Sequence, residues 1–200
     1  MSISVTRYDD SMDKLQKKLD EYITKQHSKP EIGKMYERQI RYIYEKKGWR
    51  VTPYGILKGK ADLGRDLICT KKKKTLIIQA KNWSKNKRIH EKHLMQLCGT
   101  MLQYIRSKNI NVDALFISTA RLSETAKKFA HDLKIKWQFK KLDKTYPMIK
   151  CNIGWKGEKR FFLPFDKYYD YVHIDGNKGE FYTDKIKNCL IMGFKYGGKN

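Results

Sequence analysis

A carboxylate, an amide and an ammonium group stand close together in one short part of the sequence. Asp66 is followed, after an apolar stretch, by Gln79, Ala80 and Lys81. The carboxylate of Asp66, the amide oxygen of Gln79 and the main-chain carbonyl of Ala80 are hard oxygen ligands of the kind that Mg²⁺ prefers. The Lys81 ammonium could hold an attacking water and stabilise charge that grows on a phosphate. The spacing therefore predicts metal-assisted chemistry on a phosphate.

A β-hairpin is the element that would bring these groups together. Two apolar runs, residues 66–70 and 75–80, are separated by four consecutive lysines, which is typical of two buried strands joined by a solvated turn. Asp66 begins the first strand and Lys81 ends the second, so antiparallel pairing places both at the same edge of the sheet. Gln79 and Lys81 are two residues apart and are expected to share a face.

The flanking sequence predicts a layered α/β domain. Strands are expected at 49–54, 112–118 and 135–139, and a glycine-rich bend at 55–64. Apolar residues at three- and four-residue steps predict helices at 9–27, 30–47, 89–107 and 123–131, with Glu37 on the second of them. Alternation of strands and helices is typical of an α/β fold.

The sequence changes character after Pro147, where aromatic residues crowd together among lysines and glycines. Strands are expected at 148–153 and 160–163, paired across 154–158, with a short helix near 183–192. We therefore divide the chain into an N-terminal helix (1–29), an α/β domain (30–143) and a small, aromatic, basic, β-rich appendage (144–200).

The charge of the chain predicts a polyanionic partner. Lys and Arg number 44 against 21 Asp and Glu, a formal net charge of +23 at pH 7. Such a surplus repels itself unless a partner such as nucleic acid takes up the charge. Because 35 of the 44 cations are lysine, a lysine-biased proteome is the alternative explanation.

Several classes of protein are excluded by the sequence. No stretch approaches the roughly 20 apolar residues of a membrane span, and the first residues lack the order of a secretory signal. We expect a soluble, cytoplasmic protein without a membrane partner. Four dispersed cysteines without a CxxC pair argue against a disulfide scaffold, a zinc finger or a redox motif, and favour buried thiols.

The hairpin motif resembles the PD-(D/E)XK nuclease superfamily, and within it the Mrr-type catalytic domain of type IV restriction endonucleases. The matching motifs are Asp-Leu-Gly-Arg-Asp-Leu-Ile at 62–68 and Gln-Ala-Lys-Asn-Trp at 79–83. Gly33, Tyr36 and Glu37 match the glycine, aromatic and glutamate of the first helix in this family. The resemblance covers about residues 31–137. It implies a restriction-endonuclease-like core and a Mg²⁺-dependent DNA endonuclease that hydrolyses phosphodiester bonds.

The resemblance also implies roles for single residues. Asp66 would bind the metal, Lys81 would be the catalytic lysine, and Glu37 would orient metal or water. Gln79 takes the place of the more usual Glu, which removes one negative charge and favours one Mg²⁺ with a weaker second site; Mn²⁺ is expected to substitute. Asp62 could supply a compensating carboxylate or simply stabilise a turn.

Six residues around these motifs are candidates for nucleic-acid contact. Arg65 and Trp83 lie within the two motifs, and His93 and Gln96 lie on the next helix, where they could line a DNA cleft or be ordinary solvated residues. Lys72 and Lys73 could clamp a phosphate backbone or form a charged turn.

The appendage resembles a degenerate form of the small Ada-type metal-binding module that sometimes follows nucleases. Phe165, Asp166 and Lys167 stand where a cysteine is expected, which argues against a zinc site. The segment would then either bind DNA through lysines and aromatic faces or pack onto the core or a second subunit.

Other functions are compatible with the same residues. A structure-selective nuclease such as a Holliday-junction resolvase would use the same chemistry and is expected to act as a homodimer. A catalytically inactive DNA-binding module and an RNA-directed enzyme are further alternatives.

Overall fold

The computed structural model describes residues 2–84 and 86–198, which divide into two compact units. One unit comprises residues 28–143, and the other comprises residues 1–27 together with 144–200. The N-terminal helix, which the sequence sets apart, thus belongs to the same unit as the C-terminal segment. Among the described residues, no helix is long and apolar enough to cross a membrane.

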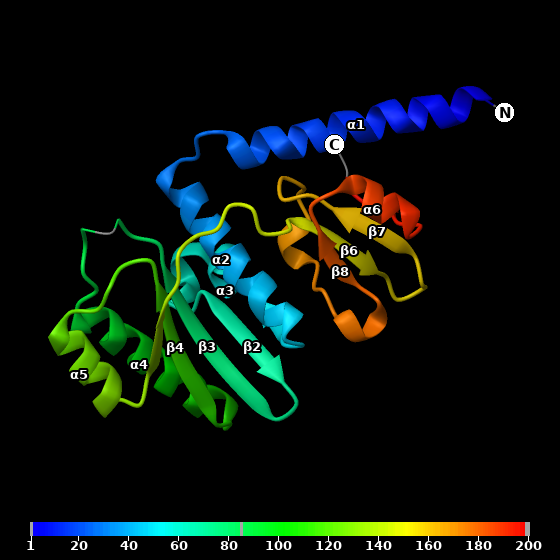
Figure 1. Ribbon diagram of the computed structural model, residues 1–200. Helices are drawn as coiled ribbons and strands as arrows, with labels where there is room; N and C mark the ends of the chain where they lie inside the picture. Colours follow the sequence, from blue (N-terminus) through cyan, green and yellow to red (C-terminus); the bar gives the residue numbers. More distant parts are fainter. Residues whose placement is uncertain (1, 85, 199–200) are drawn as a thin grey trace. The chain divides into compact units, whose positions relative to one another are not determined.

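The unit of residues 28–143 is built on a five-stranded mixed sheet with the order β1-β2-β3-β4-β5 (Figure 1). The strands are β1 (Arg50–Thr52), β2 (Leu67–Lys71), β3 (Lys74–Lys81), β4 (Val112–Ser118) and β5 (Lys136–Phe139). Strands β1 to β3 pair antiparallel, whereas β3, β4 and β5 run parallel. The central position of β3 explains why its residues are nearly all buried.

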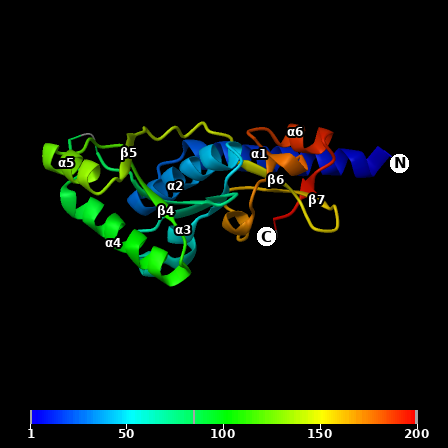
Figure 2. The same cartoon turned by 90° about the horizontal axis from the view of Figure 1, so that it is seen from below.

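Helices cover both faces of this sheet (Figure 1 and Figure 2). Helix α2 (Lys29–Lys46) places Tyr36 and Ile40 in an apolar cluster with Ile78 and Ala80 of β3. Helices α4 (Glu91–Lys108) and α5 (Glu124–Asp132) pack in a second cluster that contains Ile77. Alternate residues of β3 thus face opposite helix layers, which confirms the predicted restriction-endonuclease-like layered α/β class.

The glycine-rich segment 55–64 is helical rather than a bend. It forms α3 (Tyr54–Lys58) and a 3₁₀ turn (Gly59–Asp62), with Pro53 preceding the first turn. Proline tolerates this position because it has no N–H to leave unpaired, and Ile56, Leu57 and Lys58 favour a helix over an open loop. Gly64, with φ of +82°, then returns the chain to β2.

The second unit combines α1 (Ser2–Thr24) with a four-stranded sheet of the order β8-β6-β7-β9. Its strands are β6 (Ile149–Ile153), β7 (Lys159–Phe162), β8 (Phe181–Thr183) and β9 (Lys195–Tyr196), and α6 (Ile186–Ile191) follows β8. Helix α1 is joined to the start of α6 through Gln16, whose Oε1 accepts from Ile186 N at 2.8 Å. The sequence indicates β6, β7 and α6, whereas the two- and three-residue strands β8 and β9 are too short to show an alternating pattern.

Two cysteines that are distant in the sequence meet in this unit. Cys151 on β6 and Cys189 on α6 are buried free thiols whose Sγ atoms are 3.2 Å apart. Both are buried thiols, as the sequence predicts, and the packing of α6 on the sheet brings them together although they are far apart in the chain.

Candidate active site

The start of β2 and the end of β3 are tied together at Asp66. Its N–H donates to Ile78 O at 3.1 Å, and its Oδ2 accepts from the Ala80 N–H at 2.6 Å. The main chain of Ala80 therefore fixes the orientation of the Asp66 carboxylate. This is the hairpin edge at which the sequence analysis puts both residues.

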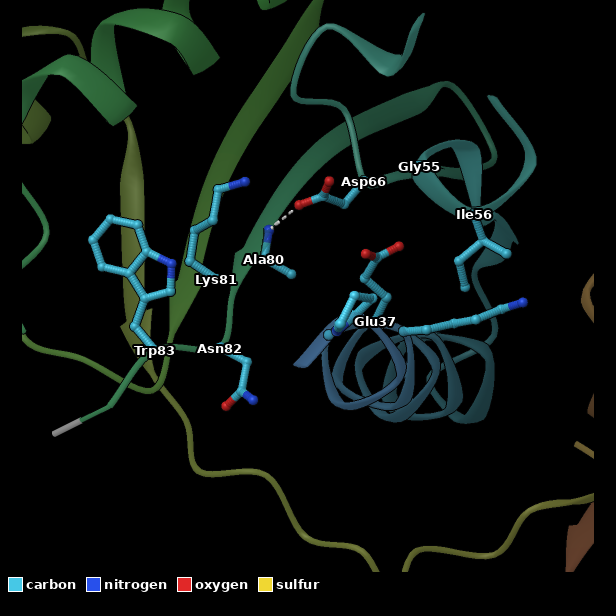
Figure 3. A pocket seen from close by; sticks show the side chains of 11 residues that line it. Glu37, Gly55, Ile56, Asp66, Ala80, Lys81, Asn82 and Trp83 are labelled. Carbon is cyan, nitrogen blue, oxygen red and sulfur yellow. Dashed lines mark hydrogen bonds between the residues drawn. The ribbon is translucent and has the colours of Figure 1, made fainter. Parts of the chain in front are cut away.

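A second carboxylate approaches from α2. A Cβ atom built on Gly55 would lie 3.1 Å from Glu37 Oε2 and 3.2 Å from Asp66 Oδ1, so both carboxylate oxygens flank one small space. Figure 3 shows the Glu37 side chain extending from α2 in the direction of Asp66. Gly55 was not predicted from the sequence, because its only signal is the absence of a side chain that would crowd these oxygens.

The start of α2 is stabilised by a capping box. The Ser28 N–H donates to Glu31 Oε2 at 2.8 Å, and the Ser28 hydroxyl accepts from the Glu31 N–H at 3.4 Å. Further along the helix, the buried Tyr36 donates its hydroxyl to Lys140 O at 2.7 Å. These contacts fix the helix on the sheet and thereby set the position of Glu37.

Lys81 completes the set at the end of β3. A cavity of about 420 Å³ is lined by eleven residues, among them Glu37, Asp66, Ala80 and Lys81. Its rim includes Lys34, Asn82 and Trp83. Two carboxylates and one ammonium from three separate elements therefore face the same space, as the labelled side chains in Figure 3 show.

The site holds Asp66 in an unusual electrostatic environment. Burial is the largest effect on the pKa of its carboxyl and raises it; the charge of Lys81 and the Ala80 N–H lower it, and the nearby Asp62 raises it slightly, so that the net pKa moves from 3.8 to about 6. Desolvation dominates because the charged form loses water that two partners replace only in part. A cation bound beside Asp66 would remove this penalty.

Gln79 is not among the residues that line the cavity, although Lys81, two residues further along β3, is. The Gln79 side chain is fully buried, and its Nε2 donates to Gln96 Oε1 at 3.2 Å. Its own Oε1 is buried without a hydrogen-bond partner. A Cβ on Gly64 would lie 2.7 Å from Gln79 Nε2, so this amide fits only beside a glycine.

Trp83 and His93 pack together next to Lys81. Their rings meet edge to face with centroids 4.9 Å apart, and the Trp83 main chain exchanges two hydrogen bonds of 2.7 Å with the Thr119 hydroxyl. Burial first, and then the charge of Lys81, lower the pKa of His93. Thr119 thus holds the main chain of Trp83 in place, a contact that was not predicted from the sequence.

The other candidate DNA contacts lie apart from the cavity. Arg65 is only 6% exposed; its guanidinium donates to Gln103 Oε1 at 3.1 Å and stacks near the rings of Tyr54 and Tyr104. It is a buried structural residue with little surface to offer a nucleic acid. Lys72 and Lys73 form the exposed turn at the opposite end of the hairpin from Asp66. Asp62 accepts from the Gly64 N–H at 2.7 Å, as a turn residue does.

The donor set fits a hard divalent ion. Two carboxylate oxygens converge on one space, and the described residues contain no group of three or more His, Cys, Asp or Glu side chains that could form a larger metal site. Mg²⁺ commonly binds through one or two carboxylates and keeps several waters. Two acidic ligands are therefore sufficient for one ion and too few for a closed protein cage.

The chain is similar to three solved structures. They are AF1548, a protein of unknown function (17% identity, TM-score 0.43), apo EndoMS (9%, 0.38) and the MspJI restriction endonuclease in complex with a 27-mer oligonucleotide (11%, 0.40). The aligned regions cover 52%, 60% and 65% of this chain but only 58%, 49% and 28% of those chains.

A search of the curated proteins found no match. The family model Mrr_cat, described as restriction endonuclease, matches residues 32–142, which include Glu37, Asp66 and Lys81. This match spans more than half of the chain and nearly all of the unit that carries the cavity. The chain therefore belongs to the Mrr_cat restriction endonuclease family.

Proposed function

We propose that this chain is a metal-dependent endonuclease that hydrolyses phosphodiester bonds in DNA. The observation that carries the proposal is the convergence of Glu37, Asp66 and Lys81 on one cavity in a member of a nuclease family. Each group has a use in phosphodiester hydrolysis: oxygen ligands for a cation, and an ammonium for the negative charge of the phosphate.

Glu37 and Asp66 would hold one Mg²⁺, with the Ala80 carbonyl and water as further ligands. When bound, the ion would lower the pKa of a water and neutralise charge on the phosphate. Gln79 Oε1, a buried acceptor without a partner, is the remaining ligand candidate, although its amide lies outside the cavity lining. Mn²⁺ is expected to replace Mg²⁺, because it accepts the same ligands.

Lys81 has a separate task. Its ammonium is a compact point charge with three donors, which suits it to hold a water and a phosphate oxygen together. The hydrogen bond from Ala80 to Asp66 keeps the neighbouring carboxylate from turning away. We therefore assign Lys81 to orientation and charge stabilisation, and Asp66 and Glu37 to the cation.

The choice of DNA as substrate rests on charge. Residues 28–143 contain 28 Lys and Arg against 10 Asp and Glu, a surplus of 18 of the total of 23. The surplus is thus concentrated in the unit that carries the cavity. A polyanion such as DNA would neutralise it, and binding would then weaken strongly as salt rises.

The test is a cleavage assay with Mg²⁺ or with EDTA, on plasmid, methylated and branched DNA. Lys81→Ala is expected to cut at least about a hundredfold more slowly while it still binds DNA, since loss of one charge-stabilising donor typically costs this much. Lys128→Ala, which removes an exposed lysine of α5, is the matched control and should cut normally. Equal rates for wild type and Lys81→Ala would refute the assigned role.

The same assay separates the alternatives. A strong preference for branched DNA, together with a dimer in analytical ultracentrifugation, would support a Holliday-junction resolvase. Binding without cutting under Mg²⁺ and Mn²⁺ would indicate an inactive DNA-binding module. Cutting of RNA but not DNA would change the substrate and leave the chemistry in place.

A further inference from the structure

The most exposed large aromatic side chain of the described residues stands at the tip of the β6–β7 hairpin. Trp155 is 89% exposed. Burial of an indole is one of the largest contributions that a single side chain can make to the stability of a fold. An exposed tryptophan makes no such contribution. Such a residue is available to a partner.

The loop that carries Trp155 is well ordered. Gly154 N donates to Glu158 O at 2.9 Å, Gly157 N to Gly154 O at 3.0 Å, and Lys156 N to Glu158 Oε2 at 3.1 Å. Gly157 has φ of +84°, a conformation that L side chains rarely adopt. The backbone is therefore set before any partner arrives, which lowers the entropy that binding must overcome.

Glycine at position 154 makes room for the carboxylate that organises this loop. A Cβ on Gly154 would lie 2.3 Å from Glu158 Cδ. The Glu158 side chain therefore lies against the loop, where its carboxylate accepts a hydrogen bond from the Lys156 N–H.

Basic side chains are present both in the Trp155 loop and on the two strands β7 and β9. Lys156 Nζ lies 4.9 Å from the centroid of the Trp155 ring. Arg160 of β7 is paired with Lys195 of the parallel strand β9, so these two cations are neighbours on one face of the sheet. Both line a hollow of about 570 Å³ that begins beside the loop at Glu158.

Glycines contribute to the lining of this hollow. Gly193 and Gly197 line it together with Arg160 and Lys195, and a Cβ on Gly197 would meet the Phe162 ring at 2.8 Å and Arg160 Cβ at 3.1 Å. Tyr196, also in the lining, has its hydroxyl bonded to Asp166 Oδ1. The lining of the hollow thus combines glycines with three cations, from Lys159, Arg160 and Lys195, and one carboxylate, from Glu158, so that positive charge is in excess there.

We propose that the surface formed by Trp155, Lys156, Arg160 and Lys195 binds single-stranded DNA, with the indole stacked on an unpaired base and the three cations on phosphates. An exposed aromatic face beside a row of cations is how proteins hold single strands without reading sequence. In a duplex the base faces are occupied by their neighbours, so the indole would find no partner there. The choice of DNA as the bound single strand rests on the proposed function.

The test uses the full-length protein in EDTA, so that binding is measured without cutting. The probe is an oligothymidylate of about 20 nucleotides, longer than the roughly 4–16 that single-strand sites cover, and it is compared with a duplex of the same length. Stacking on Trp155 should quench tryptophan fluorescence, and Trp155→Ala should weaken single-strand binding by about 5- to 150-fold. Duplex binding should change by less than about twofold.

Trp137→Ala is the matched control, because it removes another exposed tryptophan, 40% exposed on β5 of the other unit. It should leave single-strand affinity unchanged. Arg160→Gln and Lys195→Gln should each lower the slope of log affinity against log salt by about 0.7. Trp155→Phe should retain most of the affinity, which separates stacking from a general effect on folding.

Three results would overturn the inference. They are equal single-strand affinity for Trp155→Ala and wild type, an equal loss for duplex and single strand, or binding of Trp155 to anionic lipid vesicles in preference to DNA. Failure of the proposed function is a different result: a wild-type protein that binds single strands through Trp155 but never cuts DNA would refute the nuclease and leave this surface standing.

Discussion

At the scale of single residues, the buried carboxyl of Asp66 is suited to hold a cation but lowers the stability of the metal-free protein when it is ionised. Asp66 is buried, and its pKa of about 6 lies well above the 3.8 of a free carboxyl. The folded metal-free protein therefore holds its proton more tightly than the unfolded chain does. The stability contributed by that proton is complete below about pH 4 and is lost as the pH rises through about 6.

Replacement of Asp66 by Asn should stabilise the metal-free protein at pH 7.5. The shift from 3.8 to about 6 corresponds to about 3 kcal/mol at most, because one pKa unit is about 1.4 kcal/mol. Asn can still accept from the Ala80 N–H, so the gain should appear in urea unfolding at pH 7.5 and disappear at pH 4. The same variant should lose cleavage, since it lacks the carboxylate.

Asp113→Asn, at an exposed position of β4, is the control and should change stability by less than about 0.5 kcal/mol at either pH. Added Mg²⁺ should raise the unfolding midpoint of the wild type and not that of Asp66→Asn. A gain for Asp66→Asn that is the same at pH 4 and pH 7.5 would contradict the link to the Asp66 proton.

At the scale of elements, the site depends on the turn that leads into β2. Gly64 adopts φ of +82° and lies against the Gln79–Gln96 pair, so both its conformation and its lack of a side chain are required. The hairpin then carries Asp66 to the Ala80 N–H. The turn thus sets the spacing between the carboxylate and β3.

Gly64→Ala should therefore lower the free energy of unfolding by more than backbone strain alone would. A left-handed alanine costs about 1–2 kcal/mol, and the contact with Gln79 Nε2 at 2.7 Å adds about 1–3 kcal/mol of overpacking. Thermal unfolding should show the sum, and cleavage should fall as Gln79 and β3 shift.

Gly48→Ala is the matched control for this change. Gly48 also has a positive φ, of +74°, but a Cβ there would meet only the flexible end of Lys71, at 3.5 Å. Gly48→Ala should lose only the stability that backbone strain costs, and it should cleave DNA at the wild-type rate. Equal destabilisation by the two variants would show that the space beside Gln79 does not matter.

At the scale of the whole molecule, the chain holds two units with different structures. Residues 28–143 contain two apolar clusters, one on each face of the five-stranded sheet. The other unit joins the first 27 residues to the last 57 through contacts such as Tyr22 with Phe165, whose ring centroids are 6.0 Å apart. Each unit therefore has its own packing.

We expect the fragment of residues 28–143 to fold by itself. Because both apolar clusters lie within it, it should unfold cooperatively in urea and retain cleavage that depends on Lys81. A fragment of residues 144–200 alone lacks the contacts that α1 supplies. It should therefore be less ordered than residues 144–200 produced together with residues 1–27. A non-cooperative transition of the 28–143 fragment would contradict this division.

The periodicity of the sequence was sufficient to predict most of the elements. Strand β4 follows the predicted run of residues 112–118, and the hairpin of β2 and β3 was predicted from two apolar runs and a lysine turn. These patterns work because burial on both faces selects continuous apolar strands. The helix at 54–58 was missed because its glycine and short length outweighed the helix formers around it.

The sequence by itself determined the residue types of the site, the hairpin that joins Asp66 to Ala80, the α/β class and the family resemblance, because these depend on local pattern and on neighbours along the chain. The tertiary structure decided which side chains share a space. It brought Glu37 to Asp66 beside Gly55, buried Arg65, left Gln79 out of the cavity lining and left Trp155 in water. Such outcomes follow from packing between elements far apart in the chain, which no local spacing records.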